Sequence, residues 1–326
     1  MRSVFIDNFE SGEVSLRDVE DLRLPTAGEV LVEVKAAGLN RGDLLQARGK
    51  YPPPKGYSPH CPGLEFAGVI AAKGEGVNGF SVGDRVMGLA AGEAQAELLI
   101  AEASHLTKIP QHFSFADAAA IPEAFITAHD ALITQADLKA GENLLIHAVA
   151  SGVGLAALQI GKAFGATVAG TSRSAEKLEK CLARGLDLAF DTGNSGFSES
   201  LLNVTDGKGA DVILDLVGAS YLSENLTALA LKGRLMMVGL TGGRKAELDM
   251  GVMLQKRLTL RGTVLRSRSS AEKTAAVNAF ANNIIPLFDE LVLTPDLDRV
   301  YAFNDVSEAY GYLASDKSFG KVVLEW

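Results

Sequence analysis

The pattern of apolar and polar positions changes twice along the chain. In residues 1–120, alternation at Val30, Val32 and Val34 predicts half-buried strands, and glycines separate the apolar runs. These runs include VLVEVKAAGLN (30–40), LEFAGVIAAKG (64–74), GDRVMGLA (83–90) and AQAELLIA (94–101). Short strands joined by glycine turns favour a small barrel-like β domain.

A helical pattern begins near residue 115, and Pro122 predicts a break or kink within it. Strands are then predicted near 143–148, 166–171, 211–216, 233–239 and 257–264, with helices near 152–164, 174–184, 197–204 and 220–231. This alternation predicts a parallel, doubly wound sheet, so the fold class is α/β. The remaining residues hold a helical run and a final strand, KVVLE, and we expect them to rejoin the first domain.

Residues 144–173 predict a strand–turn–helix–strand unit whose turn reads A-x-x-S-G-V-G from Ala148 to Gly154. Unpaired N–H groups and the helix dipole favour a pyrophosphate at such a helix start. The full motif G-x-G-x-x-G would need glycine at Val149 and Ser151, and small residues at this kind of junction can also serve packing alone. Gly152, as a glycine, can take a conformation with positive φ. The candidate contacts are Ser151, Gly152, Val153 and Gly154.

The second strand of this unit ends in Ser172-Arg173, and Lys177 follows one helical turn on. A site for NAD would carry an Asp or Glu about 20 residues past the glycines, to bind the ribose 2′-hydroxyl. A hydroxyl and two cations suit a 2′-phosphate instead. The sequence therefore predicts NADPH as the cofactor.

Composition and charge exclude several classes of protein. The net charge of −9, from 31 basic and 40 acidic residues, argues against a general nucleic-acid binder. The two cysteines, Cys61 and Cys181, imply no disulfide framework. The first residues do not form a signal peptide, and no uninterrupted stretch reaches about 18 apolar residues. We therefore expect a cytoplasmic protein that does not span a membrane.

The chain resembles the medium-chain dehydrogenase/reductases, in the zinc-free quinone oxidoreductase branch that includes zeta-crystallin, and within it the stress-inducible mammalian subgroup. The resemblance rests on AAGLNRGDLLQARGKYPPP (36–54), PGLEFAGVI (62–70), VGDRVMGL (82–89), AAAIPEAFITAHDAL (118–132), LLIHAVASGVGLAALQIGK (144–162), LRSRSS (265–270) and FGKVVLE (319–325). It implies a GroES-like β-rich catalytic domain from residues 1–122 and 267–326. It also implies a Rossmann domain from residues 123–266, with the cofactor in the cleft between the two.

Zinc-dependent members of this superfamily bind catalytic zinc with a Cys and a Gly-His-Glu box, and a catalytic zinc needs three side-chain ligands. Here the box reads Gly63-Leu64-Glu65, and Asn40 occupies the place of the Cys. No cluster of cysteines stands where a structural zinc would be held. The sequence therefore predicts no metal.

Without a metal, the protein must orient the acceptor, and a proton must reach the oxygen on which charge develops. Tyr51 is the first candidate for a proton donor or hydrogen-bonding group, with packing on the proline-rich loop 52–54 as the alternative. Asn40 is expected to point into the cleft and bond the nicotinamide ribose or the acceptor. Asp43 either orients neighbouring groups or caps the following helix, and we favour the cap. Solvent is an alternative source of the proton.

Further cofactor contacts follow from the resemblance. They are Gln46, Thr127, Val238, Gly239, Leu240, Thr241, Val264, Leu265, Arg266 and Lys321. The family often has Tyr at the position of Asp191, near the adenosine phosphate. An acid facing a 2′-phosphate would repel it, so either Asp191 points outward or the preference for NADPH is weaker than Arg173 and Lys177 suggest.

The resemblance leaves three functional hypotheses. The first is an NADPH-dependent reductase of small quinones, and the second is an NADPH-dependent reductase of activated alkenes such as enals, enones or an enoyl thioester. The third is a non-catalytic NADPH-binding protein. The segment 258–265, LTLRGTVL, is apolar enough to pair across a two-fold axis, so we expect a homodimer, with a tetramer as the alternative.

Overall fold

The computed structural model describes residues 1–193 and 195–326, and the chain divides into two compact units. The first unit consists of residues 1–126 and 265–326, and the second of residues 127–264. The boundaries expected at 122/123 and 266/267 lie within a few residues of these divisions. Each unit has its own sheets and its own core.

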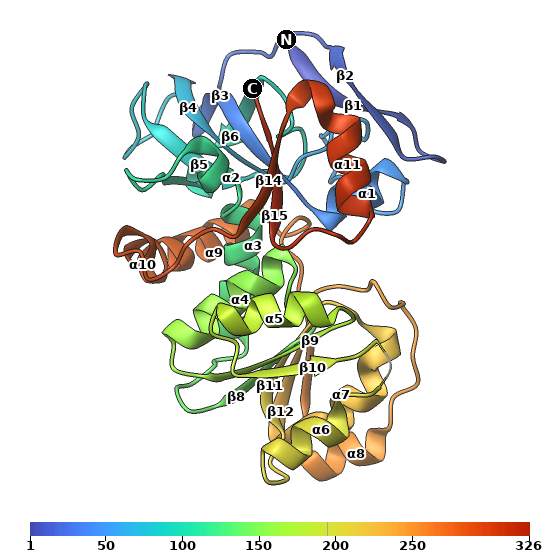
Figure 1. Ribbon diagram of the computed structural model, residues 1–326. Coiled ribbons are helices and arrows are strands. Elements are labelled where there is room, and N and C mark those ends of the chain that lie inside the picture. Colours follow the sequence, from blue (N-terminus) through green and yellow to red (C-terminus); the bar gives the residue numbers. More distant parts are fainter. Residues whose placement is uncertain (194) are drawn as a thin grey trace. The chain divides into compact units, whose positions relative to one another are not determined.

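The strands of the first unit are β1 (Arg2–Asn8), β2 (Glu13–Asp18), β3 (Glu29–Leu39), β4 (Glu65–Lys73), β5 (Arg85–Leu89), β6 (Leu98–Glu102), β7 (Leu106–Lys108), β14 (Leu297–Ala302) and β15 (Lys321–Glu325). Its helices are α1 (Arg41–Ala47), α2 (Phe115–Ala119), the start of α3 (Pro122–His129), α9 (Ser270–Asn283), α10 (Ile285–Asp289) and α11 (Val306–Ala314). Seven strands form one sheet in the order β14-β15-β3-β4-β5-β7, with β6 on β3 (Figure 1). β1 and β2 form a separate antiparallel pair.

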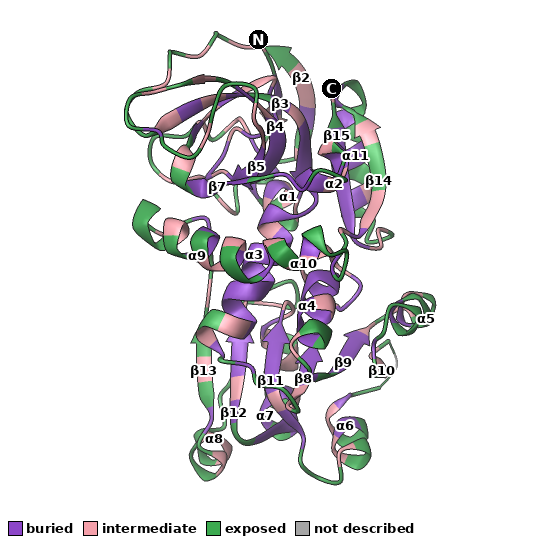
Figure 2. Ribbon diagram, turned by 90° about the vertical axis from the view of Figure 1, so that its left-hand side faces the viewer, coloured by how far each residue is buried: buried purple, intermediate pink, exposed green. Residues whose placement is uncertain are grey.

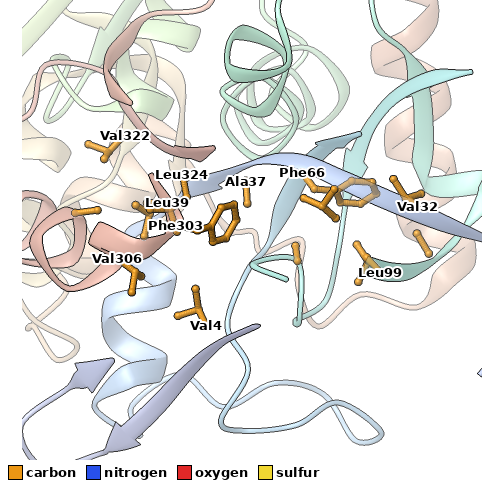
Figure 3. Close-up of a cluster of buried hydrophobic side chains, with 14 of the residues drawn as sticks. Val4, Val32, Ala37, Leu39, Phe66, Leu99, Phe303, Val306, Val322 and Leu324 are labelled. Carbon is orange, nitrogen blue, oxygen red and sulfur yellow. The ribbon is translucent and has the colours of Figure 1, made fainter. Parts of the chain in front are cut away.

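The core of the first unit follows from the alternation along β3. Val30, Val32 and Val34 are 0 %, 0 % and 2 % exposed, as half-buried strands require. Figure 3 shows this core, to which β4, β15 and α11 also contribute side chains such as Phe66 and Val306. β15 pairs antiparallel with β3, so the end of the chain lies beside its first third.

The second unit contains six parallel strands in the order β10-β9-β8-β11-β12-β13, the order of dinucleotide-binding sheets. They are β8 (Asn143–Ile146), β9 (Thr167–Ser172), β10 (Leu188–Asp191), β11 (Ala210–Asp215), β12 (Leu229–Met237) and β13 (Thr259–Gly262). The helices are the end of α3, a π-helical stretch (Asp130–Gln135), α4 (Gly152–Ala163), α5 (Ala175–Ala183), α6 (Ser198–Val204), α7 (Leu222–Ala228) and α8 (Met250–Lys256). The strand order reverses between β8 and β11, where ligands of such sheets bind at the carboxyl ends.

Three elements of the second unit differ from the sequence-based prediction. β10 was not predicted, because its four residues are too short and too exposed to show a period. The helix predicted to reach residue 231 ends at Ala228, and β12 begins at Leu229. α8 was also not predicted: it has seven residues, none of them fully buried, although Val252 and Met253 pack partly against the core. Figure 2 shows this contrast between the buried central strands and the exposed α8 and β13.

Candidate functional site

The start of α1 positions two of the predicted polar residues. Asp43, the third residue of α1, accepts the backbone N–H of the N-cap residue Asn40 with its Oδ2 at 2.8 Å, as in a capping box. Asp43 Oδ1 accepts the N–H of Gly63 at 3.1 Å and ties α1 to the loop before β4. Burial raises the pKa of Asp43 to about 6, against the effect of these N–H groups. Both oxygens of Asp43 therefore hold backbone groups.

A buried ion pair holds Asn40 at both ends of its amide. Asn40 Nδ2 donates to Glu65 Oε1 at 2.8 Å, and Asn40 Oδ1 accepts from Lys321 Nζ at 2.7 Å. Lys321 Nζ also donates to the Leu39 carbonyl at 2.9 Å and to Glu65 Oε1. The side chains of Lys321 and Glu65 are 5 % and 0 % exposed. The three donors of Lys321 are thus used within the first unit, and its expected contact with the cofactor stays a prediction.

Arg266 likewise makes its hydrogen bonds to residues of the first unit. Its Nε donates to the Ala91 carbonyl at 2.8 Å, and its two terminal nitrogens donate to the Tyr51 carbonyl and to Gln46 Oε1. Gln46 Nε2 donates to the Pro59 carbonyl at 3.0 Å. Arg266 is 4 % exposed and Gln46 is 1 % exposed. The pair holds the loop that carries Tyr51, and the expected cofactor contacts of Arg266 and Gln46 stay predictions.

Tyr51 packs against this framework. The Arg266 guanidinium lies 4.9 Å from the centre of the Tyr51 ring. The ring also lies close to Gly42, because a Cβ added to that glycine would be 3.3 Å from Tyr51 Cε1. Burial, reinforced by the nearby Glu123, raises the pKa of Tyr51 to about 12. The phenol is therefore protonated at neutral pH and can donate a hydrogen bond. Its role as a proton donor stays a prediction.

Glu123 belongs to the same cluster and was not predicted. It is the second residue of α3, and its backbone N–H donates to Glu65 Oε2 at 2.8 Å. Burial, together with the carboxylate of Glu65, raises the pKa of Glu123 to about 8. The one signal in the sequence was an acid directly after Pro122 in an otherwise apolar run.

In the second unit, the turn between β8 and α4 has the features of a pyrophosphate site. Ser151 Oγ accepts the N–H of Gly154 at 3.1 Å and caps α4. Among the described residues, no acceptor is found for the N–H groups of Gly152 and Val153, so both amides can bind an anion. Gly152 does not use the positive φ that is open to a glycine, whereas Ala148 has a φ of 48°.

The end of β9 carries the predicted adenosine side of the site. Ser172 ends the strand, Arg173 is exposed, and Lys177 lies in the first turn of α5. Asp191 ends β10 directly beside Ser172 in the strand register. Its Oδ1 accepts the N–H of Gly193 at 2.8 Å, so the carboxylate turns toward the loop that follows it. An acid therefore stands beside the two cations, at the same edge of the sheet.

Of the other expected contacts, the segment 238–241 follows the carboxyl end of β12. The N–H groups of Val238 and Gly239 donate to the Asp215 carbonyl at 2.8 and 3.1 Å, and Thr241 Oγ1 donates to the Leu216 carbonyl at 3.1 Å. Leu240 is 45 % exposed and Val264 is 43 % exposed, whereas Thr127 and Leu265 are buried. The segment 238–241 thus joins the ends of β11 and β12.

Among residues 1–193 and 195–326, no group of three or more His, Cys, Asp or Glu side chains could hold a metal ion. No helix within this part of the chain is long and apolar enough to cross a membrane. A cavity of about 510 Å³ lies among the β1–β2 turn, α1 and α11, lined by residues such as Arg41, Arg48 and Tyr310. It contains none of the predicted site residues, so we do not assign the chemistry to it.

A parallel sheet of this strand order, followed after its first strand by a helix whose first N–H groups lack an acceptor among the described residues, is typical of dinucleotide-binding proteins. The chain has a second, β-rich unit as well. Residues 26–130 match the alcohol dehydrogenase GroES-like domain, and residues 152–282 match the zinc-binding dehydrogenase family. The chain belongs to the medium-chain dehydrogenase/reductase superfamily and is a nicotinamide-dependent oxidoreductase.

Quinone and enoyl reductases are among its relatives. Quinone oxidoreductase-like protein 2 of Mus musculus is 29 % identical over 297 residues, which are 91 % of this chain and 84 % of that protein. The structure of the Escherichia coli quinone oxidoreductase complexed with NADPH matches this chain with a TM-score of 0.88 at 27 % sequence identity. The match covers 100 % of this chain and 100 % of that one. The JamJ enoyl reductase also has a TM-score of 0.88 at 27 % identity, over 99 % of this chain and 98 % of that one.

Proposed function

We propose that this protein is a cytoplasmic, NADPH-dependent reductase that transfers hydride to small quinones without a metal. The observation that carries the proposal is the pair of backbone N–H groups of Gly152 and Val153, for which no acceptor is found among the described residues, together with Ser172 and Arg173 at the end of β9 and Lys177 in the first turn of α5. Such a set binds a pyrophosphate and a 2′-phosphate. NADPH supplies the hydride when bound, and a quinone is electrophilic enough to need orientation more than activation by a metal.

The site residues have different roles in this proposal. Ser151, Gly152, Val153 and Gly154 hold the pyrophosphate, and the segment 238–241 with Thr127 and Val264 borders the nicotinamide. Asn40 is held in one orientation by Glu65 and Lys321, which bind both ends of its amide, and its contact with the nicotinamide ribose or the acceptor stays a prediction. Tyr51 supplies a protonated hydroxyl. Each of these assignments is an inference from chemistry and position.

Reduction of an activated alkene is the second candidate, favoured by the likeness to the JamJ enoyl reductase. We would measure oxidation of NADPH and NADH with 9,10-phenanthrenequinone, 1,2-naphthoquinone and a medium-chain enal side by side. Rapid NADPH oxidation with the quinones alone supports the proposal, and turnover of the enal alone overturns it in favour of alkene reduction. NADPH binding without turnover of any acceptor leaves a non-catalytic binding protein.

Arg173→Ala should weaken NADPH binding about tenfold or more and leave NADH binding nearly unchanged. A charge-assisted bond to a phosphate contributes roughly 1.5–3 kcal/mol, and NADH lacks the 2′-phosphate. The dissociation constants of both cofactors, from nucleotide fluorescence titration, test this. Arg184→Ala at the far end of α5 is the matched control. Equal losses for the two cofactors would count against the assignment of Arg173.

Asp191→Asn should raise the preference for NADPH over NADH two- to fivefold. The carboxylate lies beside Ser172 in register, and an exposed charge pair contributes roughly 0.2–1 kcal/mol. Asn keeps the oxygen that accepts the Gly193 N–H. Asp206→Asn makes the same charge change just before β11, at the opposite edge of the sheet, and should alter nothing. An unchanged ratio in Asp191→Asn would mean that its carboxylate does not act on the 2′-phosphate.

We also propose that the protein forms a homodimer through β13. This strand pairs with β12 on one side, and on its other side no strand partner is found among the described residues. An open edge is a site for pairing with a second copy. Sedimentation should therefore give about twice the chain mass of 34.3 kDa. A concentration-independent monomer would contradict the dimer.

A further inference from the structure

Four polar side chains of the second unit are buried together where β8, β9 and β11 end. They are Thr171 in β9, His147 directly after β8, Asn225 in α7 and Asp215 at the end of β11. Thr171 is 1 % exposed and the other three are 0 % exposed. We call these four residues the buried polar chain, because hydrogen bonds join each of them to the next.

The hydrogen bonds of this chain have one direction. Asn225 Nδ2 donates to Asp215 Oδ2 at 3.0 Å, so Asn225 Oδ1 faces His147 and accepts from its Nε2–H at 2.6 Å. Burial lowers the pKa of His147, so the imidazole is neutral at neutral pH. Its Nδ1 therefore accepts the hydroxyl of Thr171, at 2.9 Å. Each donor in the chain points toward the carboxylate of Asp215.

Asp215 connects the chain to two turns at the carboxyl edge of the sheet. Its Oδ1 accepts the N–H groups of Val217 and Gly218 at 2.7 and 2.8 Å, in the turn after β11. Its backbone carbonyl accepts the N–H groups of Val238 and Gly239, at the start of the segment 238–241. The position of this one residue therefore sets the position of both turns.

The other end of the chain lies at the turn before α4. His147 directly precedes Ala148, whose φ of 48° begins that turn. The carbonyl of Thr171 accepts the N–H of Val149 at 3.1 Å, and Ser172 is the next residue along β9. The same chain thus reaches the turn expected to hold the pyrophosphate and the strand end expected to hold the adenosine side.

Aromatic rings keep the imidazole in one orientation. The ring centres of Phe197 and Tyr221 lie 4.7 and 4.8 Å from that of His147. The Tyr221 hydroxyl donates to Thr192 Oγ1 at 2.8 Å, and the N–H of Thr192 donates to the Ser172 carbonyl at 2.9 Å. The imidazole cannot turn without displacing these rings, because side chains in a protein core are closely packed.

Stability alone gives little reason for a buried carboxylate at this place. Removing a charge from water costs free energy, and apolar side chains of similar volume often give an equally stable core. A fully hydrogen-bonded network instead fixes one arrangement of the segments that it joins. The chain lies where the strand order reverses between β8 and β11, and sheets of this kind bind ligands there.

We propose that the buried polar chain positions the cofactor site of this protein. It holds the ends of β8, β9 and β11 against one another, so that the turn before α4, the end of β9 and the segment 238–241 can bind one dinucleotide together. The four residues are positioning residues that act through the turns they hold. The inference rests on the proposed function, which assigns these segments to NADPH.

The test exchanges the two groups at the Asp215 end. Asp215→Asn sets two amide N–H₂ groups against each other, and Asn225→Asp sets two carboxylates against each other, so each variant alone should weaken NADPH binding about tenfold. The double variant restores the chain, since the new amide at 215 can donate to the new carboxylate at 225, which can accept from His147. It should bind NADPH within about threefold of the unaltered protein.

Asp211→Asn is the matched control, because it makes the same charge change at the opposite end of β11. The carboxylate of Asp211 accepts the N–H of Asn143 at 2.8 Å and pairs with Lys208, so this variant should lose stability. Its affinity for NADPH should stay that of the unaltered protein. Fluorescence titration with NADPH and urea unfolding, made on every variant, separate affinity from stability.

A milder pair of variants acts at the other end of the chain. Thr171→Val keeps the shape of the side chain but removes the hydroxyl that binds His147 Nδ1, so it should weaken NADPH binding about threefold or more. Thr171→Ser keeps the hydroxyl and should bind NADPH nearly as the unaltered protein does. This pair tests the inference even where Asp215→Asn does not fold.

The outcomes distinguish this inference from the proposed function. If Asp215→Asn and Thr171→Val lose stability but keep their affinity, as expected of Asp211→Asn, the chain only stabilises the fold and the inference fails. It also fails if the double variant binds no better than the single ones. NADPH binding without turnover of quinone or enal overturns the proposed reductase alone, whereas an unaltered protein that binds neither NADPH nor NADH overturns both.

Discussion

Replacing Lys321 by Met should lower the free energy of unfolding by about 3–5 kcal/mol, because it leaves the charge of Glu65 buried without a partner. The side chains of the pair are 5 % and 0 % exposed, so water cannot replace the lost ammonium. Lys321 also holds the Leu39 carbonyl and Asn40 Oδ1, at 2.9 and 2.7 Å, and both bonds are lost in the variant. Urea unfolding followed by circular dichroism measures the change.

Two variants show whether the loss comes from the buried charge. Lys321→Met combined with Glu65→Gln removes both charges and keeps an oxygen that can accept from Asn40 or Glu123, so it should recover much of the stability. Lys139→Met breaks a pair whose side chains are 63 % and 74 % exposed and should change stability by less than about 0.5 kcal/mol. If Lys321→Met resembled Lys139→Met, the pair would contribute no more than an exposed one.

Gly154→Ala should reduce NADPH affinity about 100-fold, by displacing the start of α4. A Cβ at Gly154 would lie 2.5 Å from the carbonyl oxygens of Ala148 and Val149, which are backbone atoms and cannot rotate away. The helix start must therefore shift, and the open amides of Gly152 and Val153 shift with it. Calorimetric titration with NADPH measures the loss of affinity.

The matched control for this prediction is Gly311→Ala in α11. No atom lies within 4 Å of a Cβ added there, so the variant should bind NADPH as the unaltered protein does. It should also gain up to about 1 kcal/mol in stability, because Ala is the better helix residue. An unchanged affinity in Gly154→Ala would mean that the turn before α4 does not hold the pyrophosphate.

Features that depend on near neighbours in the chain could be predicted from the sequence. Asp43, the third residue of α1, accepts the N–H of the N-cap residue Asn40, and Ser151 caps α4 three residues before Gly154. Pro122 begins α3 because its fixed φ suits the first helical residue. The alternating strands and helices of residues 143–262 predicted the parallel sheet, apart from the short β10 and the exposed α8.

The sequence by itself determined the alternating sheet, the small-residue turn before α4 and the helix caps, because propensity, periodicity and capping act over a few residues. Only the tertiary structure decided the use of Arg266, which reaches Gln46 across 220 positions, and of Lys321, which reaches Glu65 across 256. It likewise brought Glu123 to Glu65 across 58 positions. These distant contacts determine which polar side chains are buried and hydrogen-bonded to other residues of the protein. No local pattern in the sequence indicates such contacts.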